Sequence, residues 1–173
     1  MNKLILTALT ATALLLGTGA ATASAADWDP NEYIHVTTPN GSTMKITDHE
    51  SFGANEVGSF SLGGTVLGDL NGWSKPSFKS VVSRCVGGEV RVELHTEAHT
   101  YTDVRVGFVT AWLELYEGSS CNTTDLDGKS GKAVFTLDPG QMRTYTFNVN
   151  NQAEGGDFAT ATVKFAGNHY FDF

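Results

Sequence analysis

The sequence predicts an all-β protein: a single antiparallel β-sandwich, immunoglobulin-like or jelly-roll in type, with one disulfide. Three observations predict this fold. Short segments of β-type composition alternate with turn signals that contain Gly, Pro and Asn. No segment shows the 3.6-residue repeat of an amphipathic helix. Cys85 and Cys121 make an even cysteine count in a chain that begins like an exported protein, which favours a disulfide between them.

The N-terminus has the features of a secretory signal peptide. Lys3 supplies the positive charge, residues 4–17 are apolar, and Ala23-Ser24-Ala25 is a small-residue cleavage site. The apolar stretch is shorter than the roughly 20 residues of a membrane span, and no second run of that length follows. We therefore expect removal of residues 1–25, a secreted, extracellular protein, and no insertion into a membrane.

Charge limits the partners of the mature chain. Loss of Lys3 with the signal peptide changes the formal charge from −8 to −9. Nucleic-acid binding depends mainly on cationic side chains that neutralise phosphates, so we expect no nucleic-acid partner. The negative charge fits solubility outside the cell or attraction to a basic partner.

Nine segments have the composition or the alternation of strands: residues 33–36, 43–46, 57–66, 78–85, 90–98, 104–116, 133–137, 142–149 and 159–165. Turn signals separate them, for example Pro39-Asn40-Gly41 and Gly87-Gly88. Gly63-Gly64 predicts a bulge or bend within residues 57–66. The aromatic tail, residues 169–173, is a candidate for a last edge strand.

The clearest strand signal is in residues 90–98, where apolar or small residues alternate strictly with charged ones. In residues 104–116 the apolar positions slip by one residue beside Gly107, which predicts a β-bulge. Together the segments predict one sandwich domain over residues 37–173.

Residues 26–36 are predicted to form an N-terminal arm in front of this domain. The segment is acidic, contains Trp28 and is interrupted by Pro30. The β-competent run after Pro30 contains Tyr33, Ile34 and Val36, which we expect to pair with the edge of a partner's sheet while Trp28 fills a pocket. A terminus without partners is the alternative.

Two segments resemble metal sites. His95 and His99 are four residues apart, but on a strand that spacing separates them by roughly 13 Å, too far for one zinc ion. A site made by His95, Glu97 and a neighbouring strand stays open. Asp125-Leu126-Asp127-Gly128 resembles the start of a calcium loop but lacks its later glutamate. We predict no metal ligands and no cofactor.

No Gly-x-Ser-x-Gly motif or other catalytic motif occurs, so we expect a binding protein rather than an enzyme. Two alternatives stay open within that class. A protease inhibitor needs a rigid exposed loop, which residues 118–131, tethered at Cys121, would supply. A carbohydrate- or surface-binding module would use Trp73, with Trp112 and Tyr116 as further aromatic candidates.

The signal ending Ala-Thr-Ala-Ser-Ala-Ala is actinobacterial in style. With the acidic aromatic arm and the single disulfide-linked sandwich, it resembles the small adaptor subunit of streptomycete umbrella toxin particles. The resemblance is one of layout over the mature chain and includes no diagnostic motif. It implies that residues 28–36 insert into a lectin subunit and that the sandwich attaches to the toxin chain. Other secreted protein subunits would then be the partners of this adaptor.

Overall fold

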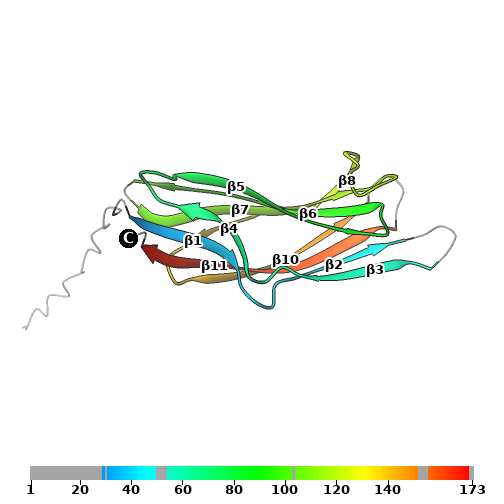
Figure 1. The fold of residues 1–173 in the computed structure, drawn as a ribbon, viewed down its shortest axis with the longest axis horizontal. Coiled ribbons are helices and arrows are strands. Elements are labelled where there is room, and N and C mark those ends of the chain that lie inside the picture. The colour runs from blue at the N-terminus through cyan, green and yellow to red at the C-terminus, as the bar shows by residue number, and fades with distance from the viewer. Residues whose placement is uncertain (1–28, 30, 50–53, 103, 152–155, 172–173) are drawn as a thin grey trace, which may run out of the picture.

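The computed structural model describes residues 29, 31–49, 54–102, 104–151 and 156–171. The expected signal peptide, Trp28 and the last two residues lie outside these ranges. The described residues form two antiparallel sheets packed against each other, so the predicted all-β sandwich is confirmed (Figure 1). No helix in the described part of the chain has the length and hydropathy of a membrane span.

One sheet has six strands: β1 (Glu32–Thr38), β2 (Thr43–Asp48), β3 (Glu56–Ser61), β4 (Thr65–Leu70), β10 (Met142–Asn150) and β11 (Phe158–Phe171). β11 lies at its centre. β10 pairs with one side of β11, while β2 and then β1 pair with the other side. β3 and β4 extend the sheet beyond β2 and β1.

The connection between β1 and β2 lies next to the connection between β3 and β4, and backbone hydrogen bonds join the two. Leu62 N donates to Ser42 O at 2.9 Å, and Gly64 N donates to Thr38 O at 2.7 Å. Gly64 has a φ of 78°, a conformation that favours glycine. The bend predicted at Gly63-Gly64 is therefore confirmed, and it divides the expected strand into β3 and β4.

The other sheet has five strands: β5 (Ser77–Val86), β6 (Val90–Tyr101), β7 (Val104–Tyr116), β8 (Leu126–Lys129) and β9 (Ala133–Leu137). β6 lies between β5 and β7, and both β8 and β9 pair with the far edge of β7. The β6–β7 register shifts between His99 and Tyr101, opposite the segment that contains Gly107, as the apolar pattern predicted. β8 is a correction, because residues 118–131 were expected to be loop throughout.

The core fills the space between the sheets. β6 contributes its alternate residues, and β7 contributes Val109, Ala111, Leu113 and Leu115, all of them fully buried. On the other sheet, β11 supplies Ala159, Ala161, Val163 and Phe165. The Phe135 ring on β9 lies 5.1 Å from the Phe165 ring, so aromatic contact joins the sheets directly.

β1 is an internal strand, which corrects the predicted boundary of the arm at residue 36. It pairs with β11 on one side and with β4 on the other. Ile34 and Val36, which were expected to contact a partner, are both 0 % exposed and belong to the core. Residues 32–36 are therefore part of the domain.

The acidic composition that suggested an arm has a structural explanation at Glu32. This carboxylate is buried, and Arg105 Nη2 on β7 lies 3.0 Å from Glu32 Oε2. His169 Nε2 on β11 contacts the other carboxylate oxygen. A buried carboxylate requires such partners. Glu32 thus connects β1 to β7 in the other sheet and to β11 in its own sheet, and it does not belong to an arm outside the domain.

The aromatic tail is the end of β11 rather than a separate edge strand. β11 continues through Gly167, where a Cβ atom would lie only 2.9 Å from Asp138 O. Gly167 N donates to Gln141 O at 3.0 Å, and Gly140 N donates to Gly167 O at 2.6 Å. The glycine therefore lets the β9–β10 turn approach the central strand closely.

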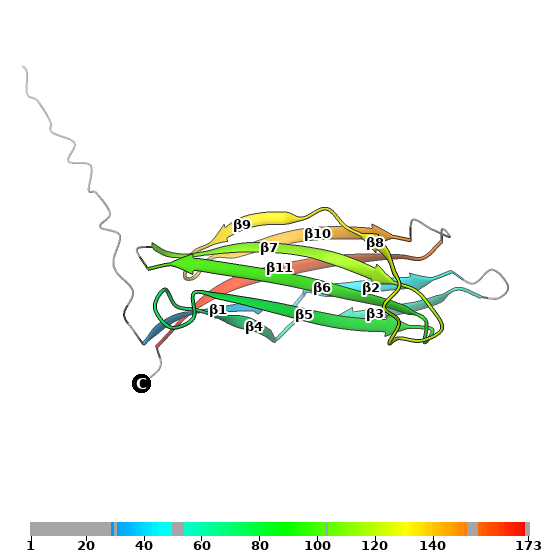
Figure 2. The same cartoon turned by 90° about the horizontal axis from the view of Figure 1, so that it is seen from above.

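The sandwich has two dissimilar ends (Figures 1 and 2). The N-terminal end contains the start of β1, the end of β11 and the β4–β5 loop, residues 71–76. The distal end contains the end of β2, the start of β3, the β5–β6 and β7–β8 connections, the end of β10 and the start of β11. Among the described residues, the carboxylates at these strand ends and in these connections include Asp48, Glu56, Glu89, Glu117, Asp125 and Asp157.

The disulfide between Cys85 and Cys121 is confirmed, with a Cα–Cα distance of 5.9 Å. Cys85 lies near the end of β5, and Cys121 lies in the β7–β8 loop. The loop therefore crosses the outer face of β6, where Arg91 Nη1 donates to Cys121 O at 2.8 Å. The covalent bond fixes this loop over the sheet.

Truncation of a β1 core residue tests the corrected boundary. We expect Ile34→Ala to lower the free energy of unfolding by roughly 2–5 kcal/mol, because it leaves a cavity in the core. The change is measured by urea denaturation. The control is Val66→Ala on β4, where the side chain is 58 % exposed and the expected change is within about 0.5 kcal/mol. Equal, small effects would show that β1 is not an integral strand.

Removal of the disulfide tests the covalent link. We expect the double variant Cys85→Ser, Cys121→Ser to lose roughly 2–5 kcal/mol of stability, because its unfolded chain is less restricted. Thermal and urea denaturation measure this loss. Alkylation of the unreduced wild-type protein should modify neither cysteine, and modification of both without reductant would contradict the assignment.

Candidate functional site

The outer face of the five-stranded sheet carries a compact group of polar and aromatic side chains. We call it the cross-strand network; its members are Arg91, Glu93, His95, Trp112, Glu114, Tyr116 and Lys129. Because the apolar side chains of β6 and β7 face the core, these alternate residues share the opposite face. The register places Glu93 opposite Glu114 and His95 opposite Trp112.

Cations and hydrogen-bond donors surround the two glutamates. Arg91 Nε lies 3.1 Å from Glu93 Oε1, and Lys129 Nζ lies 2.8 Å from Glu114 Oε1. Trp112 Nε1 donates to Glu114 Oε1 at 3.0 Å, while the Tyr116 hydroxyl donates to Glu114 Oε2 at 2.6 Å. Like charges directly across a strand pair repel each other, and these contacts offset that repulsion.

These contacts change the ionisation of Glu114 and Tyr116. Burial raises the pKa of Glu114, but hydrogen bonds from Lys129, Tyr116 and Trp112 outweigh it and lower the pKa to about 2. Burial and the hydrogen bond to Glu114 raise the pKa of the Tyr116 phenol. The carboxylate is therefore a fixed negative charge over the physiological pH range.

Ring stacking packs the network tightly. The His95 and Trp112 rings are nearly parallel, with centroids 5.1 Å apart, and Lys132 Nζ lies 4.4 Å from the Trp112 ring centre. The Arg91 guanidinium covers the Tyr116 ring at 4.4 Å. Trp112 is consequently buried although it is on the outer face. Neither ring offers an open platform for a sugar.

The structure confirms that His95 and His99 lie on a strand, and it gives them different neighbours. His99 stacks on Phe108, with ring centroids 5.2 Å apart. Glu97, the suggested third member of a site with His95, instead forms an ion pair with Lys79 at 2.6 Å. The cluster with metal-ligand spacing in the described residues consists of Glu93, His95 and Glu114, whose ligand atoms lie within 4.8 Å of one another.

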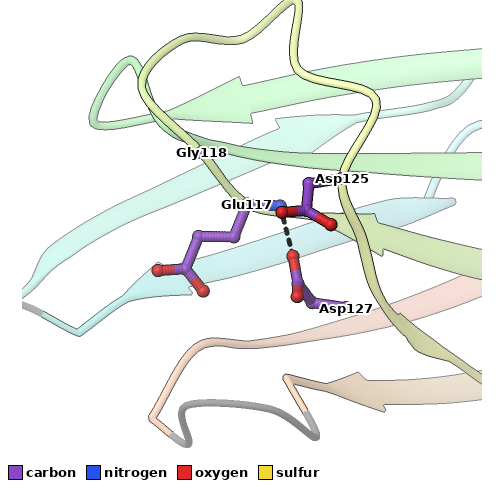
Figure 3. Close-up of a pocket in the computed structure, with 4 residues that line it drawn as sticks. All are labelled: Glu117, Gly118, Asp125 and Asp127. Carbon is purple, nitrogen blue, oxygen red and sulfur yellow. Dashed lines mark hydrogen bonds between the residues drawn. The ribbon is translucent and has the colours of Figure 1, made fainter.

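A second polar feature lies beside the network, at the distal end. Glu117, Gly118, Asp125 and Asp127 line a small open pocket of about 150 Å³ (Figure 3). Asp127 Oδ2 accepts a hydrogen bond from Glu117 N at 2.9 Å, and the Glu117 carboxylate accepts one from Asn151 Nδ2. Of the two acids in the suggested calcium segment, Asp127 therefore binds back to its own loop and holds the β7–β8 connection in shape, while Asp125 lines the pocket.

The β7–β8 loop is the segment that a protease-inhibitor function would use. It is braced, because Thr123 N donates to Ser120 O at 3.0 Å and the Thr123 hydroxyl donates to Glu117 O at 3.2 Å. Residues 118–122, however, form bends and a turn rather than an extended segment. Hydrogen bonds therefore brace the loop, and its first part consists of bends and a turn.

The residues predicted to contact a partner have different positions in the structure. Trp28 lies outside the described residues, and Ile34 and Val36 are core residues. Tyr33 points to the outer face of β1, where its hydroxyl is 3.3 Å from Ser74 Oγ and Lys75 Nζ lies 5.4 Å from its ring centre. The structure therefore joins Tyr33 to the β4–β5 loop, the loop that contains Trp73.

Sequence reasoning missed Glu93 and Glu114 as members of one site. Each was visible as a charged residue in an alternating strand, but nothing in the sequence states which residues face each other across two strands. The register of β6 and β7 brings them together. Comparisons of the chain with family models, curated proteins and solved structures found no match.

The lowered pKa of Glu114 predicts a contribution to acid stability. A carboxyl whose pKa falls from 4.5 to about 2 on folding stabilises the fold above its unfolded-state pKa. That contribution, roughly 3 kcal/mol at most, is lost as the pH falls from about 4.5 towards 2. Urea denaturation of wild type and Glu114→Gln across this range measures it. Equal pH slopes for the two proteins would contradict the assignment.

Proposed function

We propose that this chain is a secreted, non-catalytic binding protein that attaches to another secreted protein subunit through the N-terminal end of its sandwich. The adaptor subunits that the chain resembles in layout provide the model for this role. The observation that supports the proposal is that a single buried side chain, Asn71, fixes both the start of β1 and the loop that presents Trp73.

Asn71 is 0 % exposed and uses both ends of its amide. Its Nδ2 donates to Asp29 O at 3.2 Å and to Glu32 O at 2.5 Å. Its Oδ1 accepts hydrogen bonds from Trp73 N at 2.7 Å and from Ser74 N. The hydrogen bonds of Asn71 thus hold the start of β1 and the β4–β5 loop together as one unit.

Trp73 is presented on that unit. Its side chain is 62 % exposed, and its loop is closed by paired backbone hydrogen bonds between Asn71 and Lys75. An aromatic side chain on a fixed loop loses little conformational freedom on binding, which is why such residues dominate many interfaces. Trp73 is therefore the anchor we assign to the described surface.

The predicted docking segment is shortened accordingly. Ile34 and Val36 are withdrawn from it, because they fill the core. Residues 26–31 remain, with Trp28 as their aromatic residue and Asp29 O bound to Asn71. Trp28 and Trp73 would then contact the same partner, one from the segment and one from the loop, and Tyr33 would contribute at the edge.

A carbohydrate-binding function is the second candidate, and the exposure of Trp73 favours it. An exposed indole beside the Ser74 hydroxyl and the Lys75 ammonium group also has the composition of a small-ligand surface. The two candidates differ in their dependence on residues 26–31. A protein partner engaged by the segment requires these residues, whereas a sugar stacked on Trp73 does not.

Two variants test the proposal: deletion of residues 26–31 behind an intact signal peptide, and Trp73→Ala. We expect each to reduce recovery of the partner subunit from the producing organism's medium at least tenfold while the domain stays folded. The deletion should lower the melting temperature slightly, because it removes the Asp29 carbonyl that accepts a hydrogen bond from Asn71, and Trp73→Ala should leave it unchanged. Untagged protein is immunoprecipitated, because Phe171 pairs with Glu32 and a C-terminal tag would sit at the same end. Mass spectrometry quantifies the partners.

Phe158→Ala is the matched control, since this aromatic residue is 45 % exposed and lies at the distal end. Full recovery with both test variants would overturn the proposal. Loss with Trp73→Ala alone, accompanied by loss of glycan binding, would establish the carbohydrate-binding alternative instead.

A further inference from the structure

The cross-strand network brings two carboxylates to one imidazole nitrogen. Each glutamate uses one oxygen, Oε1, for its cation, as described above. The other oxygens point towards the same atom: Glu93 Oε2 lies 3.0 Å and Glu114 Oε2 lies 3.1 Å from His95 Nε2. Two carboxylate oxygens and one imidazole nitrogen therefore meet at a single place on the sheet surface.

The geometry points to a binding site for a divalent transition metal of the zinc type, formed by Glu93, His95 and Glu114. Neighbouring ligands around a tetrahedral ion with bonds of about 2.0–2.1 Å lie roughly 3.3 Å apart, close to the two distances found here. The mixed nitrogen and oxygen set suits zinc, whereas calcium and magnesium prefer oxygen alone.

The neighbours of the three ligands hold them in place. Arg91 positions Glu93, while Lys129 and Trp112 position Glu114 through the oxygen that does not face His95. The Tyr116 hydroxyl donates to the Glu114 oxygen that does face His95. Stacking on Trp112 fixes the plane of the His95 ring. Such contacts around the ligands orient them and tune their affinity for the ion. The Cys85–Cys121 disulfide supports this arrangement, because the loop it tethers accepts a hydrogen bond from Arg91.

The site is open to solvent on one side. The Glu93 and His95 side chains are 17 % and 19 % exposed, so an ion can enter and a water molecule can complete its coordination. Arg91 and Lys129 oppose a positive ion, but the Lys129 side chain is 57 % exposed and can turn into water. The charge of −9 on the mature chain acts in the other direction, because it attracts cations.

The sequence supplies a matched control for this site. His99 lies on the same face of the same strand, four residues after His95, and stacks on Phe108 instead of joining the glutamates. Its substitution removes an imidazole without touching the proposed ligands.

Zinc titration of tag-free, chelator-treated protein by isothermal calorimetry tests the site. We expect one ion per chain, at least tenfold weaker binding for His95→Ala and for Glu93→Gln, and unchanged binding for His99→Ala. The Glu93→Gln variant keeps the side-chain volume and leaves the His95–Trp112 stack intact. Circular dichroism and thermal melting check that each variant is folded. Cobalt(II) substitution should give visible absorption bands that both test variants lose.

Two results would overturn the inference. One is the absence of saturable 1:1 binding by the wild-type protein. The other is equal weakening by His95→Ala and His99→Ala, which would assign the metal to scattered surface histidines. In either case the three side chains form only an ion-pair network on the sheet.

Discussion

The pairing of β1 with the end of β11 is the constraint on which the rest of this structure depends. β11 is long enough to pair with β10 on one side and with β2 and β1 in succession on the other. Because β1 fills the position in the sheet between β11 and β4, its side chains Ile34 and Val36 become part of the core. Glu32 can then be buried between Arg105 and His169, so that the first residue of the strand contacts both sheets.

The two ends of the sandwich have different chemistry as a consequence. At the N-terminal end, Asn71 connects the start of β1 to a loop with an exposed tryptophan, which forms the surface to which we propose a partner binds. At the distal end, the disulfide and the carboxylates of the β7–β8 loop hold a connection that crosses the sheet. The cross-strand network lies beside this connection and depends on the strand register, so the two proposed sites are independent of each other.

Much of the fold was predictable from local patterns. The strict alternation in β6, the phase slip in β7 and the glycine pair between β3 and β4 each indicated what the structure shows, and the two cysteines indicated their disulfide. The predictions that failed concern side chains whose contacts are distant in the sequence. Glu32 resembled a residue of a solvated arm, because its partners on β7 and β11 are not visible locally. Glu93 and Glu114 form one cluster only through the register of two strands.

Hydrogen–deuterium exchange tests the central claim that β1 is an integral part of the sandwich. The account predicts that the backbone amides of β1 exchange as slowly as those of β11, since both strands open only when the whole domain unfolds. Rapid exchange of β1 beside a protected β11 would contradict it. The start of β1 would then be a mobile arm, and the N-terminal end would lack the fixed surface on which the proposed function rests.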